Sequence, residues 1–588
     1  MIHYFSSIKE LTSRFKDILL ALSLANLCFI KVWTGLIGSA TDTRGRFEVY
    51  NIENFAGIMI NVVVLAFLLW TANRVAMHIG NSIVIKLARI VFVISLLVPL
   101  NSFISTQTPD FSLTLLPEYL SKSDALILLP LGLIFIFSAI MQWRHATIGA
   151  AAAVPLLLIG RTSLAIILLD LAVLIAIALI FWYSKQTVKI ACTALLILSP
   201  LVLINFSQAL WMMSHTASIA RPKPFEGNSE KRLLWIVFDE MDQNLCFDNR
   251  PDSVKLVEID RLRDQAIYAS RAYPPSDYTL LSLPSLITGR FVSSCEPVTP
   301  SRMMLTFESS RDKVDWRSQP NIFSNARQLG INTAMIGWYH PYDRILSDNL
   351  TTCAYHYLSN RSLFDCMQEQ MLDMTQAIPF VSHFNLFNVT EKKRHLRRKY
   401  HKSDYTKIME DAKLVASDPG LGLIFLHFPI PHLPGIYDRQ TDELTVESGK
   451  SYLDNLELAD RTIGELRRSM EEAGIWEDTT VLVTSDHWWR ADQWCCIKNH
   501  TQHAWTTEDG ETFEKHLSGK VDGRVPFLLK LAGQKQRAIY ENDFNTVLTH
   551  DLFLALLRGE ISDQKSVIDW IDSYRSIGKS PYLFGHLR

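Results

Sequence analysis

The sequence predicts a protein of two unlike parts: an N-terminal multi-span α-helical membrane domain, and a C-terminal α/β domain with a mainly parallel sheet between layers of helices. Three observations predict this fold class. Long apolar runs dominate the first 212 of the 588 residues, which no soluble domain of that size needs. After residue 232, strand-length apolar runs alternate with helical patterns. The formal net charge of −2 implies no bulk attraction to nucleic acid.

The membrane domain is expected to cover residues 1–212. Each candidate span is close to the roughly 20 residues that a bilayer requires. The segment 147–160 is short for a span and contains Pro155, so it is either a seventh helix or a re-entrant segment. The six longer candidates are 17–37, 55–73, 82–104, 123–142, 163–183 and 189–211.

Basic residues in the short connections predict the orientation of this domain. Most of them fall on one side if the N-terminus is cytoplasmic and the segment 147–160 crosses the membrane. Arg44 and Arg46 fall on the opposite side. Seven crossings then place the C-terminal domain outside the cytoplasm.

The C-terminal domain is expected to cover residues 233–588, after a polar linker at 213–232 that contains two prolines. Its strands and helices alternate along the chain, which is typical of a mainly parallel sheet covered by helices on both faces. Strands are expected at 233–238, 333–338, 421–427, 480–485 and 525–531, and helices at 254–265, 451–474 and 545–558.

Polar residues directly follow two of these buried strands. Asp239 and Glu240 follow the first strand, and Asp486 and His487 follow the run 480–485. An open α/β sheet binds its ligand beyond the carboxyl ends of its strands. Carboxylates, a hydroxyl and an imidazole together suit a divalent metal ion.

Thr279 comes directly before a short apolar helical pattern that ends in Gly289. A hydroxyl at the start of such a helix lies where free amides and the helix dipole favour an anion, such as phosphate or sulfate. Pro284 fits this helix if it lies in the first turn. The alternative is a core helix that is capped by Ser276 or Asp277.

The ordered set of motifs resembles the sulfatase-like branch of the alkaline phosphatase superfamily. Within that branch, the most similar architecture is that of the membrane-bound phosphoethanolamine and phosphoglycerol transferases, of which lipoteichoic acid synthase is one relative. The resemblance covers roughly the last three fifths of the chain. The motifs are the strand before Asp239, Thr279 before SLPSLITGR, HFPIPHLP at 427–434, SDH at 485–487 and RVPFLLKLAGQ at 524–534.

The resemblance implies a metal-dependent enzyme with Thr279 as its nucleophile. Glu240 is either a second carboxylate ligand or only a surface carboxylate. An imidazole ligand favours Zn or Mn over Mg or Ca. One divalent ion would be held by Asp239, Thr279, Asp486 and His487.

Three further histidines, His427, His432 and His516, are expected to bind substrate. The alternative for each is a satisfied structural histidine. The family usually has Gly after the histidine of its SDH motif, whereas this chain continues with Trp488, Trp489 and Arg490. That departure affects the local backbone and the substrate preference.

Six cysteines lie in the C-terminal domain, and an even number in an extracytoplasmic domain indicates disulfides. Cys353 and Cys366 are spaced to close a short loop. The adjacent residues Cys495 and Cys496 are expected to form disulfides with two other partners, for which Cys246 and Cys295 are candidates. A zinc cluster is the alternative, although no CxxC pair is present. The six are Cys246, Cys295, Cys353, Cys366, Cys495 and Cys496.

These features predict an integral protein of the bacterial cytoplasmic membrane with a periplasmic catalytic domain. We expect it to transfer phosphoethanolamine or phosphoglycerol from a phospholipid donor to an envelope glycan or lipid acceptor, through a phosphothreonine at Thr279. One alternative is a membrane-anchored hydrolase of phosphodiesters or sulfate esters. Another is a membrane scaffold or transporter with a degenerate domain. A sulfatase proper is disfavoured, because threonine cannot replace the Cys or Ser that is oxidised to an aldehyde in that motif.

Overall fold

The computed structural model describes residues 2–37, 52–80, 185–214, 222–227, 229–299, 302–357, 361–378, 388–490 and 522–574, with a few residues between 84 and 102. The chain divides into two compact units. The first contains Met1–Gly38, Asn51–Thr216 and Arg361–Arg394, and the second contains Ser39–Tyr50, Ala217–Asn360 and His395–Arg588.

The first unit is helical. Two of its described helices, Ile52–Ile79 and Lys189–Trp211, are long and apolar enough to cross a membrane, and a bent pair with a 63° bend gives a third span if it counts as one. These helices coincide with the first, second and last expected spans. The other expected spans and the segment 147–160 lie largely or wholly outside the described residues. The elements are α1 (Ile2–Cys28), α2 (Ile30–Ile37), α3 (Ile52–Ile79), α9 (Lys185–Leu198), α10 (Pro200–Ser214) and α15 (Leu363–Gln376).

Helix α15 belongs to this first unit, although the sequence boundaries placed residues 361–394 in the C-terminal domain. A network of amides joins it to α3. The side chain of Asn61 donates to Oε1 of Gln370 and to the carbonyl of Met367, both at 3.0 Å. Gln370 Nε2 donates to the carbonyl of Asn54 at 2.8 Å. The buried polar groups of an apolar helix therefore find their partners about 300 residues later in the chain, as the separations of 306, 309 and 316 residues show.

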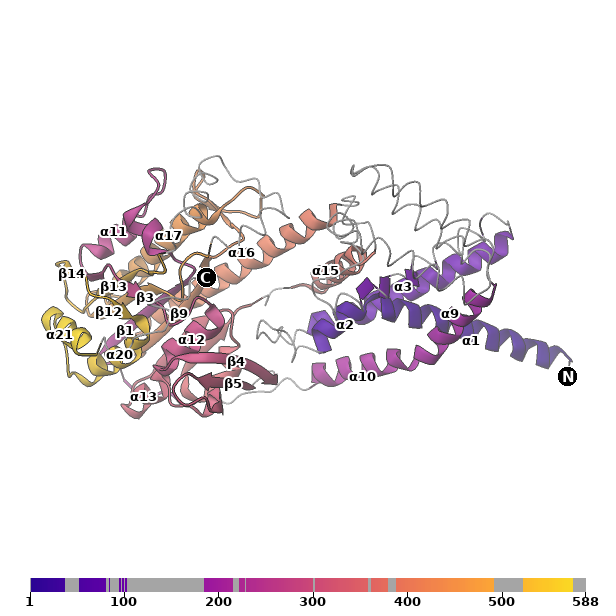
Figure 1. The fold of residues 1–588 in the computed structure, drawn as a ribbon, viewed down its shortest axis with the longest axis horizontal. Coiled ribbons are helices and arrows are strands. Elements are labelled where there is room, and N and C mark those ends of the chain that lie inside the picture. The colour runs from indigo at the N-terminus through magenta and orange to yellow at the C-terminus, as the bar shows by residue number, and fades with distance from the viewer. Residues whose placement is uncertain are drawn as a thin grey trace, which may run out of the picture. The chain divides into compact units, whose positions relative to one another are not determined.

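The second unit is built on an eight-stranded mixed sheet (Figure 1). Five neighbouring strands, from the fourth to the eighth in the order below, are parallel, and the third is antiparallel to both of its neighbours. All five expected strands are present. The order is β14 (Ala538–Tyr540), β2 (Ile267–Ala269), β13 (Phe527–Lys530), β12 (Thr479–Ser485), β1 (Arg232–Asp239), β9 (Leu423–Pro431), β7 (Thr333–Gly337) and β8 (Thr352–Tyr355).

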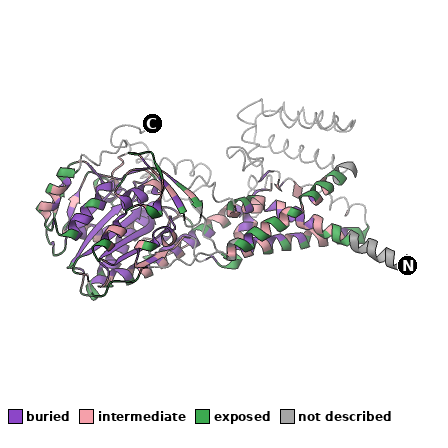
Figure 2. Ribbon diagram, turned by 90° about the horizontal axis from the view of Figure 1, so that it is seen from below, coloured by how far each residue is buried: buried purple, intermediate pink, exposed green. Residues whose placement is uncertain are grey.

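Helices cover both faces of this sheet, and its five central strands are buried (Figure 2). Alternate residues of β1 enter two different cores, as the pleat of a strand requires. Trp235 belongs to one core and packs edge-on against Phe425 and Phe553, while Ile236 belongs to the other. The first core includes α12 (Thr279–Thr288), α13 (Ile322–Gln328), α20 (Thr549–Arg558) and α21 (Gln564–Tyr574), and the second includes α11 (Val257–Arg263), α16 (Val389–Ala416) and α17 (Tyr452–Glu472).

Smaller elements complete the second unit. Three antiparallel strands form a separate sheet, and two pairs of short strands lie elsewhere. The separate sheet consists of β4 (Val292–Thr299), β5 (Arg302–Phe307) and β6 (Lys313–Asp315), and the pairs are β3 (Ala272–Tyr273) with β15 (Phe544–Asn545) and β10 (Tyr437–Asp438) with β11 (Glu443–Leu444). The short helical segments are Asn244–Asp248, Trp316–Ser318, α14 (Tyr342–Ile345), Ser347–Asn349 and Thr546–Leu548.

The described residues contain no disulfide, so the predicted bond between Cys353 and Cys366 finds no support. Cys353 is buried in β8 of the second unit, whereas Cys366 is buried in α15 of the first. Their spacing in the sequence gives a loop length but does not show which unit each residue enters. Cys246 and Cys295 are free thiols, and the adjacent pair at 495–496 lies outside the described residues.

Helix α12 begins at Thr279 without a side-chain cap. Tyr278 is its N-cap residue, and its side chain makes no capping hydrogen bond. The alternative of a helix capped by Ser276 or Asp277 is therefore not observed. Ser276 instead accepts the backbone N–H of Tyr278 at 3.2 Å, which turns the chain before the helix starts. The amides of the first turn are thus left without a capping side chain.

Pro284 lies in the second turn of α12, so the condition that it lies in the first turn, where a proline fits without loss, is not met. A proline there cannot donate to the carbonyl of Leu280, four residues earlier. Two hydroxyls add bonds around this position. Ser285 Oγ donates to the carbonyl of Leu281, and Thr288 Oγ1 donates to the carbonyl of Pro284, both at 2.7 Å.

The substitution Gly289→Ala is expected to destabilise the protein more than Gly330→Ala. Both glycines have positive φ, 68° and 77°, a conformation that costs alanine about 1–2 kcal/mol. A Cβ at Gly289 would also lie 2.6 Å from Nδ1 of His550, whereas a Cβ at Gly330 meets nothing within 4 Å. Thermal unfolding of the full chain in detergent measures the difference. Equal losses in the two variants would contradict this account of the end of α12.

Candidate active site

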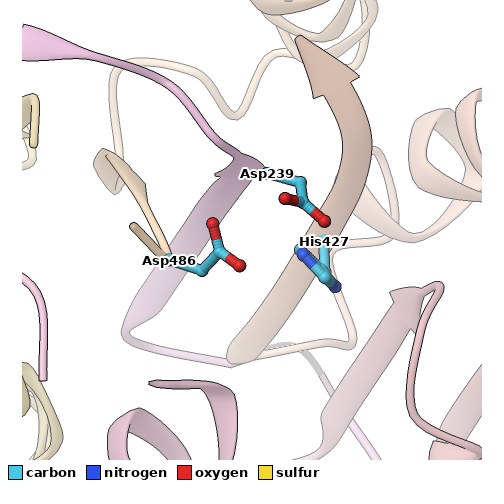
Figure 3. Close-up of side chains that lie close together, drawn as sticks. All are labelled: Asp239, His427 and Asp486. Carbon is cyan, nitrogen blue, oxygen red and sulfur yellow. The ribbon is translucent and has the colours of Figure 1, made fainter. Parts of the chain in front are cut away.

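Three adjacent parallel strands bring Asp239, His427 and Asp486 together at one edge of the large sheet (Figure 3). Strand β1 pairs with β12 so that Phe238 lies beside Ser485, and with β9 so that Val237 lies beside His427. One ligand atom from each of the three clustered residues lies within 4.8 Å of the others, and all three residues are buried. The carboxyl ends of these strands, where a ligand is expected, thus carry three side chains that could hold a metal ion.

The imidazole of His427 is in the tautomer that leaves Nε2 unprotonated, as binding a metal ion through Nε2 requires. Its Nδ1 lies 3.3 Å from the carbonyl oxygen of Trp338, which can only accept, so Nδ1 carries the proton. Nε2 is buried and has no hydrogen-bond partner among the described residues. Burial lowers the pKa of His427 to about 3, so the ring is neutral. A neutral imidazole with one nitrogen held by a carbonyl is the usual form of a metal-binding histidine.

Thr279 and His487 form the second half of the site. Thr279 Oγ1 lies 3.1 Å from Nε2 of His487. Nδ1 of His487 lies 2.9 Å from the carbonyl oxygen of Trp488 and so carries the proton, which leaves Nε2 to accept from the threonine hydroxyl. Nε2 also lies 3.7 Å from Oδ1 of Asp239 and 3.5 Å from Oδ2 of Asp486. The structure therefore brings together all four residues expected to hold the metal.

Asp486 is fully buried, and its two oxygens differ. Oδ1 accepts the backbone N–H groups of Glu240 at 3.2 Å and His487 at 2.8 Å. Oδ2 has no hydrogen-bond partner among the described residues. Burial raises the pKa of Asp486 to about 7. A divalent cation would satisfy both this oxygen and Nε2 of His427, so the residues present fit a metal ion.

Glu240 makes a sharp turn directly after Asp239. Its φ is 67°, which costs a non-glycine residue roughly 1–3 kcal/mol. The turn is fixed because the hydroxyl of Tyr452 donates to the Glu240 carbonyl at 2.6 Å. The buried carboxylate of Glu240 lies 3.5 Å from Nη2 of Arg490, and Glu240 is not part of the three-residue metal cluster.

The three histidines expected to bind substrate have different places. His427 joins the metal cluster, a role that could have been recognised from its position at the end of an expected strand. His432 follows β9, and its backbone N–H donates to the carbonyl of Asp239 at 3.1 Å. Its ring lies 5.7 Å from that of Trp338. His516 lies outside the described residues.

The sequence matches a known family model. The model described as Sulfatase matches residues 231–558, more than half of the chain. A comparison with curated proteins found no match.

Several solved structures are similar at low identity. The lipoteichoic acid synthase LtaP from Listeria monocytogenes is 15% identical, with a TM-score of 0.34 over 58% of this chain and 76% of that one. The phosphonate monoester hydrolase of Agrobacterium radiobacter is 12% identical, with a TM-score of 0.31 over 56% and 74%. A protein of the alkaline phosphatase superfamily from Vibrio parahaemolyticus is 10% identical, with a TM-score of 0.34 over 59% and 70%. These likenesses are too low to indicate a substrate.

The affinity of the site for Zn²⁺ is expected to fall about tenfold for each pH unit below about 7. One proton must leave Asp486 before the carboxylate binds a metal, and its pKa is about 7. Binding therefore releases a proton, so affinity rises with pH and levels off above that value. His427, with a pKa of about 3, is already neutral and adds nothing to the slope. Calorimetric titration between about pH 5 and about pH 8 measures the slope, and a flat profile would refute it.

Proposed function

The chain belongs to the sulfatase family, and from that premise we propose that it is a membrane-anchored, metal-dependent phosphotransferase with Thr279 as its nucleophile. One observation carries the proposal. A buried threonine hydroxyl at the first residue of α12 is hydrogen-bonded to His487 beside a cluster of two carboxylates and a second imidazole. A hydroxyl in that setting is placed to become a nucleophile rather than a structural cap.

The proposed metal ligands are Asp239, His427, Asp486 and His487, with the oxygen of Thr279 completing the set. A divalent cation held by these residues would lower the pKa of the threonine hydroxyl and would neutralise charge on the phosphoryl oxygens. Two imidazoles among the ligands favour Zn or Mn over Mg or Ca. Burial lowers the pKa of His487 well below its usual range, so this ring is better suited to ligation than to accepting a proton.

The proposed reaction has two displacements at phosphorus. In the first, Oγ1 of Thr279 forms a bond to phosphorus, and the bond from phosphorus to the alcohol oxygen of the donor lipid breaks. The proton of the Thr279 hydroxyl is lost as this bond forms, and the alcohol takes up a proton as it leaves. In the second displacement, a hydroxyl of the acceptor attacks phosphorus and loses its proton, and Oγ1 leaves and takes up a proton, which restores the threonine hydroxyl. His432, beside Asp239, is proposed to contact the substrate.

The proposed donor is a phospholipid that carries phosphoethanolamine or phosphoglycerol, and the proposed acceptor is an envelope glycan or lipid. The membrane helices support a lipid donor, because such a donor is met at the bilayer surface. An active site outside the cytoplasm would have access to envelope acceptors. Water as the acceptor would make the same site a phosphodiesterase.

Thr279→Ala is expected to abolish transfer while leaving folding and membrane insertion unchanged, because only a hydroxyl and a methyl group are removed. Thr279→Ser is expected to keep part of the activity, since the hydroxyl remains and only the methyl restraint on its rotation is lost. Transfer is measured by mass spectrometry of lipid and glycan extracts from cells that express each variant.

A trapped adduct provides the control for this assignment. After exposure to donor lipid, the intact mass should rise by the transferred group, and peptide mapping should place the group on Thr279. Full activity in the alanine variant, or an adduct on Ser282 or Ser285, would disprove the assignment. Release of the free headgroup without transfer would identify a hydrolase.

A reporter alkaline phosphatase fused after Arg588 is expected to be active. The reason is the distribution of basic residues in the short connections, which places the C-terminal domain outside the cytoplasm. A reporter that works only in the cytoplasm, fused at the same point, should be inactive. The opposite pair of results would reverse the proposed topology.

A further inference from the structure

The segment directly after His487 reads Trp488, Trp489 and Arg490. The Trp488 carbonyl accepts from Nδ1 of His487, and the two residues after it have no assigned role in the site. Trp489 is buried and stacks on the ring of Tyr452, with ring centroids 4.4 Å apart and an interplanar angle of 18°. Since the hydroxyl of Tyr452 also holds the Glu240 carbonyl, the stacking fixes this segment relative to the turn beside the metal ligands.

Arg490, the next residue, lies between the two parts of the candidate active site. Its side chain is only 13% exposed, and Nη2 lies 3.5 Å from the buried carboxylate of Glu240. Its Cζ lies 4.7 Å from the centre of the Tyr278 ring. Glu240 directly follows Asp239, and Tyr278 directly precedes Thr279. The guanidinium is therefore held beside both the metal cluster and the nucleophile.

Two donor atoms of this guanidinium are buried and meet no acceptor in the part of the chain that the structure describes. Neither Nε nor Nη1 of Arg490 has a hydrogen-bond partner among the described residues. Arginine carries five N–H donors and stays charged, so a buried guanidinium is normally surrounded by acceptors. The contact to Glu240, at 3.5 Å, occupies only Nη2. An ion pair with Glu240 thus accounts for one end of the side chain and leaves the other two nitrogens unexplained.

We propose that Arg490 is a substrate-binding residue that donates from Nε and Nη1 to non-bridging oxygens of the tetrahedral oxyanion presented to Thr279. This inference rests on the proposed function for the position of the reacting group. Glu240 and the Tyr278 ring hold the guanidinium in place, and the incoming anion supplies the missing acceptors. Guanidinium groups are well suited to phosphoryl oxygens in buried sites. The positive charge of Arg490 would also remain beside the phosphoryl group after the donor alcohol has left.

The test is anion binding to the full chain in detergent, with its metal site loaded with Zn²⁺. Inorganic phosphate and inorganic sulfate are the probes, titrated by calorimetry. Arg490→Met keeps much of the side-chain length and removes the charge and the donors, so phosphate binding should weaken about 10- to 100-fold. The matched control is Arg302→Met, because Arg302 is an exposed arginine of β5 that pairs with Asp315. This control should bind phosphate as the parent does.

Two further measurements separate substrate binding from a structural role. Zn²⁺ content should be unchanged in Arg490→Met, because Arg490 is not a ligand. Arg490→Lys keeps the charge but loses the planar donor set, so its phosphate affinity should fall between those of the parent and Arg490→Met. This variant also provides the test if Arg490→Met does not fold.

The outcomes distinguish this inference from the proposed function. Unchanged phosphate and sulfate affinity in the folded Arg490 variants, with lower thermal stability alone, would show only a structural ion pair and overturn the inference. A parent protein that binds neither anion would overturn it as well. If sulfate binds and depends on Arg490 while phosphate does not bind, Arg490 remains an oxyanion-binding residue and the proposed phosphoryl transfer fails.

Discussion

Parallel pairing of β1 with its two neighbours is the constraint on which the site depends. The register places Phe238 beside Ser485 and Val237 beside His427, so one carboxylate follows each of two strands and an imidazole extends from the third. Because side chains alternate along a strand, a shift of one residue would turn these groups to the opposite face. The two apolar cores on either side of β1 oppose such a shift, because Trp235 and Ile236 would exchange cores.

The same pairing of strands also buries carboxylates away from water. Asp239 and Asp486 are buried beside two neutral imidazoles, and burial of an ionised carboxylate is costly unless an opposite charge lies nearby. The raised pKa of Asp486 is a sign of that cost. A divalent cation bound there would offset it, since its charge is opposite to that of the carboxylates.

The strands and most of the ligand set could be predicted from the sequence, because apolar runs of strand length followed by Asp or His identify the carboxyl ends of buried strands. Details that depend on three-dimensional packing could not be predicted from the sequence. His427 ends an expected strand, which places it near the carboxylates, but nothing in HFPIPHLP shows that its Nε2 has no hydrogen-bond partner among the described residues. The position of Pro284 in α12 depends on where the helix starts, and the sequence left a start capped by Ser276 or Asp277 open beside a start at Thr279. The pairing of Cys353 with Cys366 rested on sequence distance, which does not show that the two residues belong to different compact units.

The amide network between α3 and α15 has a consequence for biosynthesis. Asn54 and Asn61 emerge from the ribosome early, whereas their partners Met367 and Gln370 are made about 300 residues later, as the separations of 306 to 316 residues require. Until then, the polar groups of an apolar helix must be satisfied by water, lipid headgroups or another protein. The first unit therefore cannot reach its final packing while it is the only part of the chain that has been translated. Its assembly waits for a segment that lies within the sequence of the second unit.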